Sequence, residues 1–274
     1  MPPTLLAIGA HPDDETMFAG GTLAWAARHG LTVRLLGVTR GEGGETGDPP
    51  VTTQAQLGAT RAAELRAAGA ALGATSVEFL PFIDPLITHT GPDPAPASAL
   101  FRIDATPEEF ERAIVAAIRA TRAAVLLTHG SNGEYGHPQH LYTHETVRRA
   151  FDSAGDPARF PEVGTPHAPT ALYTWAATFP TDGNERLERL LNQDDPADWL
   201  LDLDDDLLTQ KEQAARCHRS QMGLFLRRAE GRDLRDMLLR RESLRRVVVR
   251  NGSTDDPLAT LLASEPQAQR VVAG

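Results

Sequence analysis

The chain has 274 residues, of which 41% are hydrophobic and 23% charged, a composition that permits a full hydrophobic core in one domain. The formal net charge of −10 argues against general nucleic-acid binding, which relies on basic patches. The single cysteine excludes an internal disulfide, and no apolar run approaches the roughly 18 residues of a membrane span. The first residues also lack the basic region and apolar core of a signal peptide, so we expect a cytoplasmic protein with no membrane or nucleic-acid partner.

The first eighty residues alternate between strand-like and helical patterns. Apolar runs at residues 5–10, 32–39 and 76–80 predict strands, and residues 17–29 and 53–72 have helical patterns. This βαβ order predicts an α/β fold, Rossmann-like, with a mostly parallel sheet flanked by helices. In such open sheets the functional site lies at the carboxyl ends of the strands.

The remaining elements follow the same alternation with longer irregular connections. We expect a proline-rich surface loop over the site at 82–107, a helix at 107–122, strands at 123–127 and 171–176, an irregular connection at 152–169 and an acidic segment at 181–206. The whole chain, residues 1–274, is predicted to form a single domain, with 207–274 as a C-terminal helical part. A homo-oligomer formed through the helical pattern of Leu207 to Arg250 is a hypothesis that rests on that periodicity alone.

One imidazole and three carboxylates are crowded together where the first strand ends, in the run His11-Pro12-Asp13-Asp14-Glu15. Neighbouring carboxylates repel one another, and a divalent metal bound by the imidazole and one carboxylate relieves this repulsion while another carboxylate remains free as a base. The run therefore predicts a hydrolytic metal site. Taken alone, it is equally compatible with an ordinary acidic helix start.

A second cluster follows the apolar run at 123–127 and reads Asn132-Gly133-Glu134-Tyr135-Gly136-His137-Pro138-Gln139-His140-Leu141-Tyr142-Thr143-His144. Catalytic zinc usually takes three protein ligands and leaves one position open. His11, Asp14 and a histidine of the second cluster would complete such a set. The same donor set also suits ferrous iron, so the residues alone leave zinc and iron open.

The two clusters resemble the hallmarks of the PIG-L/LmbE-type deacetylases, a His-Pro-Asp-Asp-Glu motif near the N-terminus and a later His-Pro-Asp-His. The first motif matches completely and the second in three of four positions. The resemblance extends from about Leu5 to the segment 211–221, and the stretch 132–144 is most similar to the branch that acts on mycothiol and bacillithiol precursors and conjugates. It implies a Rossmann-like, metal-dependent N-deacetylase of glucosamine-containing compounds.

Carried over to this chain, the resemblance implies that zinc (Zn²⁺) is bound by His11, Asp14 and His140, and that Asp13 is the general base. It gives His137 the role of a cationic electrostatic stabiliser or acid, and Tyr135 that of a mobile hydrogen-bond donor to the substrate carbonyl. How these last two roles divide is left open.

Gln139 departs from the family pattern, which usually has aspartate at this position. A carboxylate would orient a histidine and raise its pKa, whereas glutamine orients it without adding charge. The ligand set is retained, so we keep the activity and expect the protonation state of His137 and the pH optimum to be affected.

Several other residues have two interpretations. His144 lies one helical turn after His140 and is a rival ligand, although a packing or supporting role is the alternative. Arg61 is predicted to bind substrate, because its Thr-Arg-x-x-Glu-Leu pattern recurs in the family; the equal alternative is a structural ion pair of Arg61 and Glu64 that anchors helix to loop. His129 and His218 are expected to be structural or rim residues.

The predicted function is hydrolysis of an N-acetyl group on a glucosamine-containing small molecule by zinc-activated water. Two alternatives remain, an amidase of thiol-sugar conjugates and a non-catalytic sugar-binding relative. The first would accept a bulky acyl group, and the second would need no general base, so the presence of Asp13 argues against it.

Overall fold

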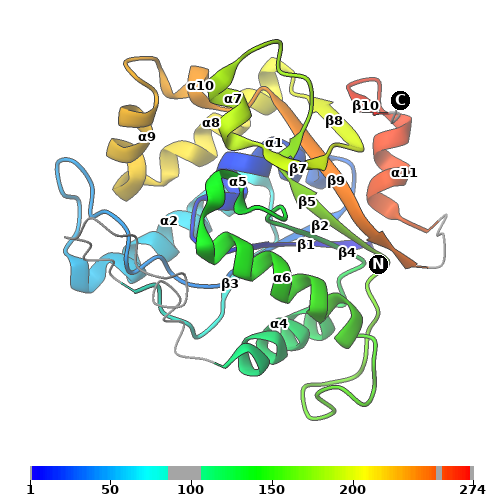
Figure 1. The fold of residues 1–274 in the computed structure, drawn as a ribbon. Helices are drawn as coiled ribbons and strands as arrows, with labels where there is room; N and C mark the ends of the chain where they lie inside the picture. The colour runs from blue at the N-terminus through cyan, green and yellow to red at the C-terminus, as the bar shows by residue number, and fades with distance from the viewer. Residues whose placement is uncertain (1, 86–105, 251–254, 272–274) are drawn as a thin grey trace.

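The computed structural model describes residues 2–85, 106–250 and 255–271 (Figure 1). Its centre is an eight-stranded sheet with the strand order β10-β8-β9-β5-β4-β1-β2-β3. The strands of this sheet are β1 (Thr4–Gly9), β2 (Thr32–Gly37), β3 (Ser76–Phe79), β4 (Val125–Thr128), β5 (Ala171–Trp175), β8 (Trp199–Asp202), β9 (Arg241–Val249) and β10 (Ala268–Arg270). A small separate sheet pairs β6 (Ala177–Thr178) with β7 (Asn192–Pro196).

Five neighbouring strands, from β3 across β2, β1 and β4 to β5, run parallel to one another. Strands β9, β8 and β10 extend the sheet beyond β5 in antiparallel pairings. The predicted α/β fold with a mostly parallel sheet is confirmed. Its parallel part brings the carboxyl ends of β1 and β4 together at one edge.

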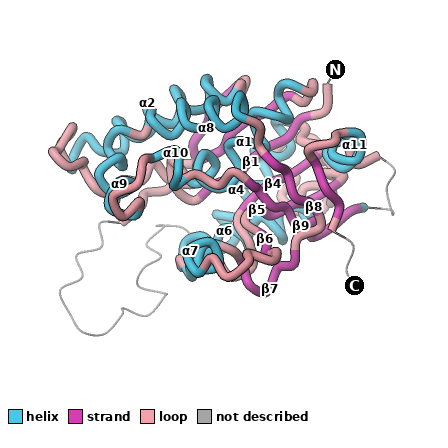
Figure 2. Tube along the Cα trace, turned by 90° about the horizontal axis from the view of Figure 1, so that it is seen from above, coloured by secondary structure: helices cyan, strands magenta, loops and turns pink. Residues whose placement is uncertain are grey.

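Alternating side chains of the central strands build a separate core on each face of the sheet. In β1, Leu5 and Ala7 join one hydrophobic cluster, whereas Leu6 and Ile8 join the other. Consecutive side chains of a strand point to opposite faces, so a strand that is apolar throughout can be covered on both sides. The first face is covered by α1 (Asp14–Arg28), α2 (Leu57–Leu72) and α8 (Asp205–Cys217), the second by α4 (Pro107–Thr121) and α6 (Pro138–Ser153). Figure 2 shows α2 and α8 on one side of the strands and α6 on the other.

Shorter helices surround the edge where the parallel strands end. They are the 3₁₀ turns η1 (Gln54–Gln56) and η2 (Arg219–Gln221) and the helices α5 (Gly133–Gly136), α7 (Glu185–Leu190), α9 (Met222–Arg228) and α10 (Leu234–Met237). Helix α11 (Pro257–Ser264) lies beside β10 at the other end of the molecule (Figure 1).

The C-terminal part differs from the sequence-based expectation. The segment 207–274 is not only helical, because β9 lies between β5 and β8 inside the main sheet and β10 is added at its edge. The acidic segment 181–206 likewise contains α7, β7 and β8. Their strand patterns were missed because charged residues interrupt them: β9 begins Arg-Glu-Ser and β7 reads Asn-Gln-Asp-Asp-Pro. Pairing with other strands, rather than local pattern, decides such segments.

A buried ion pair ties this C-terminal strand to the helical layer. The Lys211 Nζ of α8 lies 2.6 Å from Glu242 Oε1 of β9, and both side chains are almost completely buried. The Glu242 carboxylate also accepts hydrogen bonds from the backbone N–H groups of Gly21 and Thr22 in α1. One carboxylate therefore joins α1, α8 and β9.

Lys211→Met is expected to lower the free energy of unfolding by about 3–5 kcal/mol, because it leaves the Glu242 charge buried without its cation. The matched control is Arg216→Met on the same helix, which removes a half-exposed ion pair with Glu212 and should cost about 1 kcal/mol or less. Urea unfolding of both variants measures the difference. Equal losses of unfolding free energy in the two variants would show that the buried Lys211–Glu242 pair contributes no more to stability than an exposed pair.

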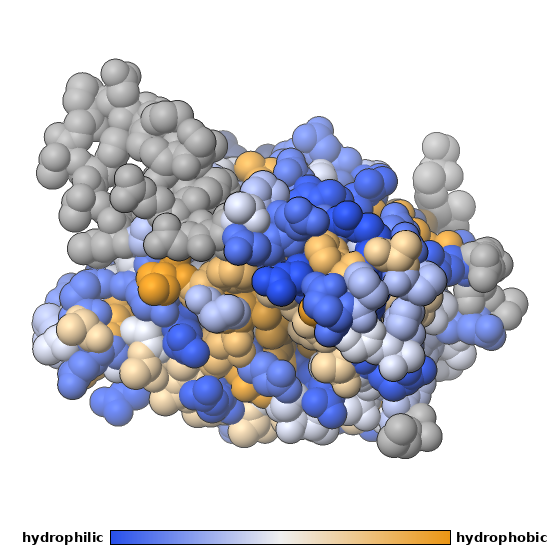
Figure 3. Space-filling model, turned by 90° about the horizontal axis from the view of Figure 1, so that it is seen from below, coloured by the Kyte–Doolittle hydropathy of each residue, from blue (hydrophilic) through white to orange (hydrophobic). Residues whose placement is uncertain are grey.

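The surface seen in Figure 3 is largely hydrophilic, with hydrophobic residues gathered in a band near the middle of that face. None of the helices described is long and apolar enough to cross a membrane. The predicted loop over the site, 82–107, falls mostly outside the described residues, which end at 85 and resume at 106.

Candidate metal centre

The first cluster forms a tight turn between β1 and α1. Gly9 ends the strand, and a Cβ at this position would lie 2.8 Å from the Glu15 carboxyl group, so any larger residue would have to displace that group. Asp13 has φ 143° and ψ −24°, a strained backbone for a non-glycine residue. Asp14 is the first residue of α1, and its Oδ2 accepts a hydrogen bond of 2.8 Å from the His11 backbone N–H. The turn thus directs three functional side chains to the same edge of the sheet.

The second cluster reaches that edge from the neighbouring parallel strand. β4 ends at Thr128, and α6 starts at Pro138, a residue suited to the first turn of a helix. His140 therefore lies in the first turn of α6. Since β1 and β4 are parallel neighbours, their carboxyl ends bring His11, Asp14 and His140 together.

The side chains of the three expected metal ligands, His11, Asp14 and His140, lie close together and form what we call the ligand triangle. His140 Nε2 lies 3.3 Å from His11 Nδ1 and 3.3 Å from Asp14 Oδ1, and His11 Nδ1 lies 3.5 Å from Asp14 Oδ2. A tetrahedral ion with bonds of about 2.0–2.1 Å holds its ligand atoms about 3.3 Å apart. The two imidazole nitrogens have this spacing, and each lies at a similar distance from one of the two Asp14 oxygens, so the side chains suit such an ion in chemistry and bring their donor atoms within its reach.

Two overlapping groups of possible ligands meet at His140, one with His11 and His137 and the other with Asp14 and His129. His129 is an unsuitable ligand. In its neutral form its Nε2 lone pair accepts the Ala10 backbone N–H at 3.0 Å, and in its protonated form it has no free lone pair. The expected set of His11, Asp14 and His140 takes members from both groups, and His137 is a further imidazole beside it.

Glu134 contacts the Nδ1 atom of His140, on the opposite side of the ring from the ligand atom Nε2. This residue was not singled out from the sequence. Its Oε2 lies 2.7 Å from His140 Nδ1 and 3.0 Å from His129 Nδ1, with all three side chains buried. A carboxylate on Nδ1 turns Nε2 of His140 toward the metal position. Although burial alone would raise it, the charges of His129 and His140 and hydrogen bonds from both rings hold the pKa of Glu134 well below its usual range. Its position within the second cluster was the only sequence signal.

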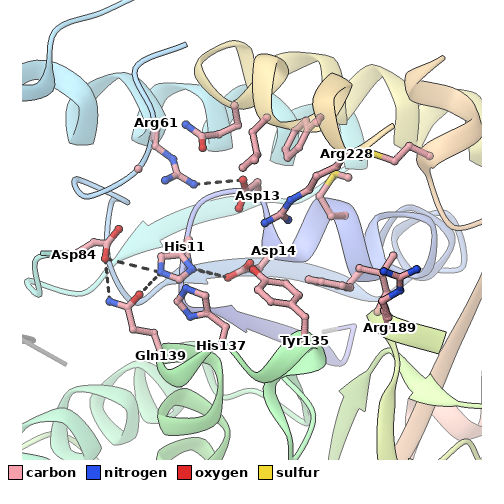
Figure 4. Close-up of a pocket in the computed structure, with 18 of the residues that line it drawn as sticks. His11, Asp13, Asp14, Arg61, Asp84, Tyr135, His137, Gln139, Arg189 and Arg228 are labelled. Carbon is pink, nitrogen blue, oxygen red and sulfur yellow. Dashed lines mark hydrogen bonds and ion pairs between the residues drawn. The ribbon is translucent and has the colours of Figure 1, made fainter. Parts of the chain in front are cut away.

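Asp13, the expected general base, lies beside the ligand triangle and is paired with Arg61. Its side chain does not cap α1, and it points into the cavity toward Arg61 (Figure 4). Burial raises the pKa of Asp13 to about 6, and the neighbouring Arg61 cation limits this rise. A carboxylate with a pKa close to neutrality is suited to accept and release a proton.

The Arg61 guanidinium contacts the turn between β1 and α1. Its Nη2 donates to the Pro12 carbonyl at 2.9 Å and lies 3.4 Å from Asp13 Oδ2, while Nη1 donates to the Gly41 carbonyl at 3.2 Å. Glu64 does not pair with Arg61, because its carboxylate accepts two hydrogen bonds from Ser220. Arg61 therefore anchors its helix to neighbouring loops, as one interpretation expected, but its partners are Pro12, Asp13 and Gly41 rather than Glu64.

His137 and Tyr135 lie on the cavity side of the centre. The His137 ring stacks on that of His140 at 4.5 Å between centroids, and Tyr135 is 43% exposed with the Arg228 guanidinium 5.3 Å from its ring centre. Burial, followed by the charge of His11, lowers the pKa of His137 to about 2. The neutral ring is therefore favoured here, which differs from the cation expected from sequence.

The rival ligand His144 points elsewhere. Its Nδ1 donates to the backbone carbonyl of His129 at 2.8 Å, so it braces the β4 end rather than facing the ligand triangle. His218 is buried and hydrogen-bonded to Thr16 at 3.1 Å. Both histidines therefore hydrogen-bond to neighbouring parts of the fold, as a structural role requires.

Two of the expected ligands, His11 and Asp14, border a cavity of about 650 Å³, within the usual range for small-molecule sites. Asp13, His11 and Tyr135 line it near the metal position, as Figure 4 shows. Farther away, the walls combine apolar side chains of α1 and α9 with arginines of α7 and α9: Met17, Phe18, Leu224, Phe225, Arg186, Arg189 and Arg228.

Fold and site together define an α/β protein with a candidate metal site of histidines and a carboxylate at the carboxyl ends of parallel strands. The family model for PIG-L, GlcNAc-PI de-N-acetylase, matches residues 6–151, which include both clusters. The chain belongs to the PIG-L family.

Named relatives agree with this assignment. A 1D-myo-inositol 2-acetamido-2-deoxy-alpha-D-glucopyranoside deacetylase of Rhodococcus opacus is 39% identical over 183 residues, which are 64% of this chain and 61% of the relative. The match thus spans about three fifths of that relative's length. A second deacetylase of this name, from Frankia alni, is 34% identical over 258 residues, 82% of this chain and 87% of the relative.

Among solved structures, the N,N'-diacetylchitobiose deacetylase of Pyrococcus horikoshii has a TM-score of 0.61 and 16% identity, covering 89% of this chain and 83% of its own. This likeness confirms the fold. The reaction has to be argued from the site.

Proposed function

We propose that this chain is a metal-dependent N-deacetylase that removes an acetyl group from a glucosamine-containing small molecule. The observation that carries the proposal is the cavity-facing carboxylate of Asp13, which is paired with Arg61 and lies beside the three proposed metal ligands. The deacetylase names of the relatives support the same reaction.

Zinc is the proposed ion, with His11, Asp14 and His140 as its ligands. Two imidazoles and a carboxylate suit it, and the pKa of Asp14 favours the ligating form. Burial opposes ionisation of Asp14, but the charges of His140 and His129 hold its pKa well below the usual range. Bound there, the ion would polarise the amide carbonyl and increase the acidity of water.

The chain's own residues supply the proton movements. Asp13 accepts the proton of the attacking water, whose oxygen adds to the acyl carbon, and the protonated Asp13 then returns a proton to the amine nitrogen as the C–N bond breaks. The products are acetate and the free amino sugar. Tyr135, at the cavity rim, is the proposed donor to the carbonyl oxygen, and Arg61, which lines the cavity, remains a proposed substrate-binding residue.

The test is amine release from a panel of N-acetylglucosamine conjugates by metal-stripped protein and by protein reloaded with zinc or ferrous iron. We expect release only from reloaded protein, and the conjugate with the highest kcat/KM identifies the substrate group beyond the sugar. Comparison of the two metals shows which ion supports turnover.

Bulky N-acyl conjugates in the same panel separate the alternatives. Preference for a bulky acyl group would replace the deacetylase with an amidase of thiol-sugar conjugates. Tight metal binding without release from any conjugate would point to a sugar-binding relative, and absence of metal binding would contradict the proposal altogether.

A further inference from the structure

The outer nitrogen of His11 is held by a chain of two side chains from distant parts of the sequence. His11 Nε2 lies 2.5 Å from Gln139 Oε1, and Gln139 Nε2 donates to Asp84 Oδ1 at 2.9 Å. Asp84 and Gln139 are 6% and 4% exposed. Figure 4 shows the three side chains in a row beside the cavity.

Asp84 is itself held in place by the glycine-rich loop. Its Oδ2 accepts the Gly43 backbone N–H at 3.2 Å, and its own backbone N–H donates to Glu42 Oε2 at 3.0 Å. The carboxylate therefore faces Gln139 in a fixed orientation. It lies 3.9 Å from His11 Nε2, too far for a direct hydrogen bond.

The donor and acceptor of each hydrogen bond between Asp84, Gln139 and His11 can be assigned by starting from the Asp84 carboxylate. An ionised carboxylate only accepts hydrogen bonds, so the Gln139 amide must present its NH₂ group to Asp84. The amide oxygen then faces His11, and Nε2 of His11 must carry the proton. The neutral ring has its lone pair on Nδ1, the atom 3.3 Å from His140 Nε2 in the ligand triangle.

We propose that Asp84, acting through the Gln139 amide, is a positioning residue that selects the metal-binding tautomer of His11. The proposal rests on the proposed metal centre but not on the identity of the substrate. It also explains how glutamine can stand at position 139, because the carboxylate one step farther out supplies the charge that glutamine lacks.

The proposal predicts weaker zinc binding, for two different reasons, in two nearly isosteric variants. In Asp84→Asn the oxygen of the new amide can still accept the Gly43 backbone N–H, while its NH₂ group faces Gln139. The Gln139 amide would then turn over, so that its oxygen accepts from residue 84 and its NH₂ group faces His11 Nε2. This favours the wrong tautomer, with the proton on Nδ1. In Gln139→Glu two carboxylates face each other across the 2.9 Å contact.

The double variant Asp84→Asn/Gln139→Glu reverses the link and restores its polarity. The amide introduced at position 84 would donate to the carboxylate introduced at position 139, which again accepts the His11 Nε2 proton. We expect each single variant to bind zinc about 10–100-fold more weakly than the wild type, and the double variant to recover most of this loss.

The measurement is the zinc dissociation constant by chelator competition, with thermal unfolding of each variant as a check of folding. Gln210→Glu is the matched control: its amide donates to the Ala71 carbonyl, and Gln210 does not line the cavity, so zinc affinity should be unchanged. A ¹⁵N histidine spectrum of the zinc-loaded wild type and double variant should show His11 protonated at Nε2.

Single variants with wild-type zinc affinity, a double variant no better than the singles, or His11 protonated at Nδ1 would each overturn the proposal. These outcomes leave the proposed deacetylase intact if the wild type still releases amine. Conversely, rescue of zinc affinity in a protein that releases no amine would support the positioning role and contradict the proposed function.

Discussion

Asp13→Asn is expected to lower kcat by about 10²–10⁴-fold while zinc affinity stays close to that of the wild type. Asparagine cannot accept the proton of the attacking water, but it retains the size and shape of aspartate, so the turn at φ 143° should be no more strained than in the wild type. Asp13 is outside the ligand triangle, which is why metal binding should survive. Steady-state kinetics and chelator competition on the same preparations test both halves of the prediction.

The control for this variant is Glu45→Gln in the neighbouring glycine-rich loop. Glu45 is a partly exposed carboxylate paired with Arg227, and it does not line the cavity. Its removal should leave kcat unchanged. If Asp13→Asn retained wild-type kcat, another group would be the base and the proposed role of Asp13 would be wrong.

His140→Ala should abolish tight metal binding, with a dissociation constant raised by more than about 100-fold, because two remaining ligands cannot hold the ion in a three-ligand site. The Glu134 carboxylate would lose one of its two histidine partners in the same step. Isothermal titration with zinc measures the change directly. Amine release should fall in parallel.

His144→Ala is the matched control, since it removes the same side chain one turn later on α6. His144 donates to the His129 carbonyl, so the variant should lose about 1 kcal/mol of stability and keep its zinc. Loss of zinc by His144→Ala and retention by His140→Ala would reverse the ligand assignment.

The convergence of the two clusters could be anticipated from sequence because both follow apolar strands directly. Parallel neighbours place such strand ends at one edge, so His11, Asp14 and His140 could be grouped from the sequence alone. Their spacing in the structure agrees with that grouping. Their role as zinc ligands stays a prediction until metal binding is measured.

The supporting residues could not be anticipated in the same way. Asp84 lies 55 positions from Gln139 in a proline-rich stretch without a recognisable motif, and only the folded chain brings them together. Glu134 was inside a cluster already noted, but its φ of 58° and its contact with two buried rings depend on the turn before α6. Long-range contacts of this kind carry no local pattern.

The place of β9 in the sheet also affects how the chain is made. β5 pairs with β4 on one side, but its other edge remains open until residues 241–249 have been synthesised, long after the ligand residues 11–140. An open strand edge readily pairs with other chains. The nascent protein therefore passes through a stage in which the metal-ligating half is complete while one sheet edge is exposed, and this is the stage at which aggregation or chaperone binding should be greatest.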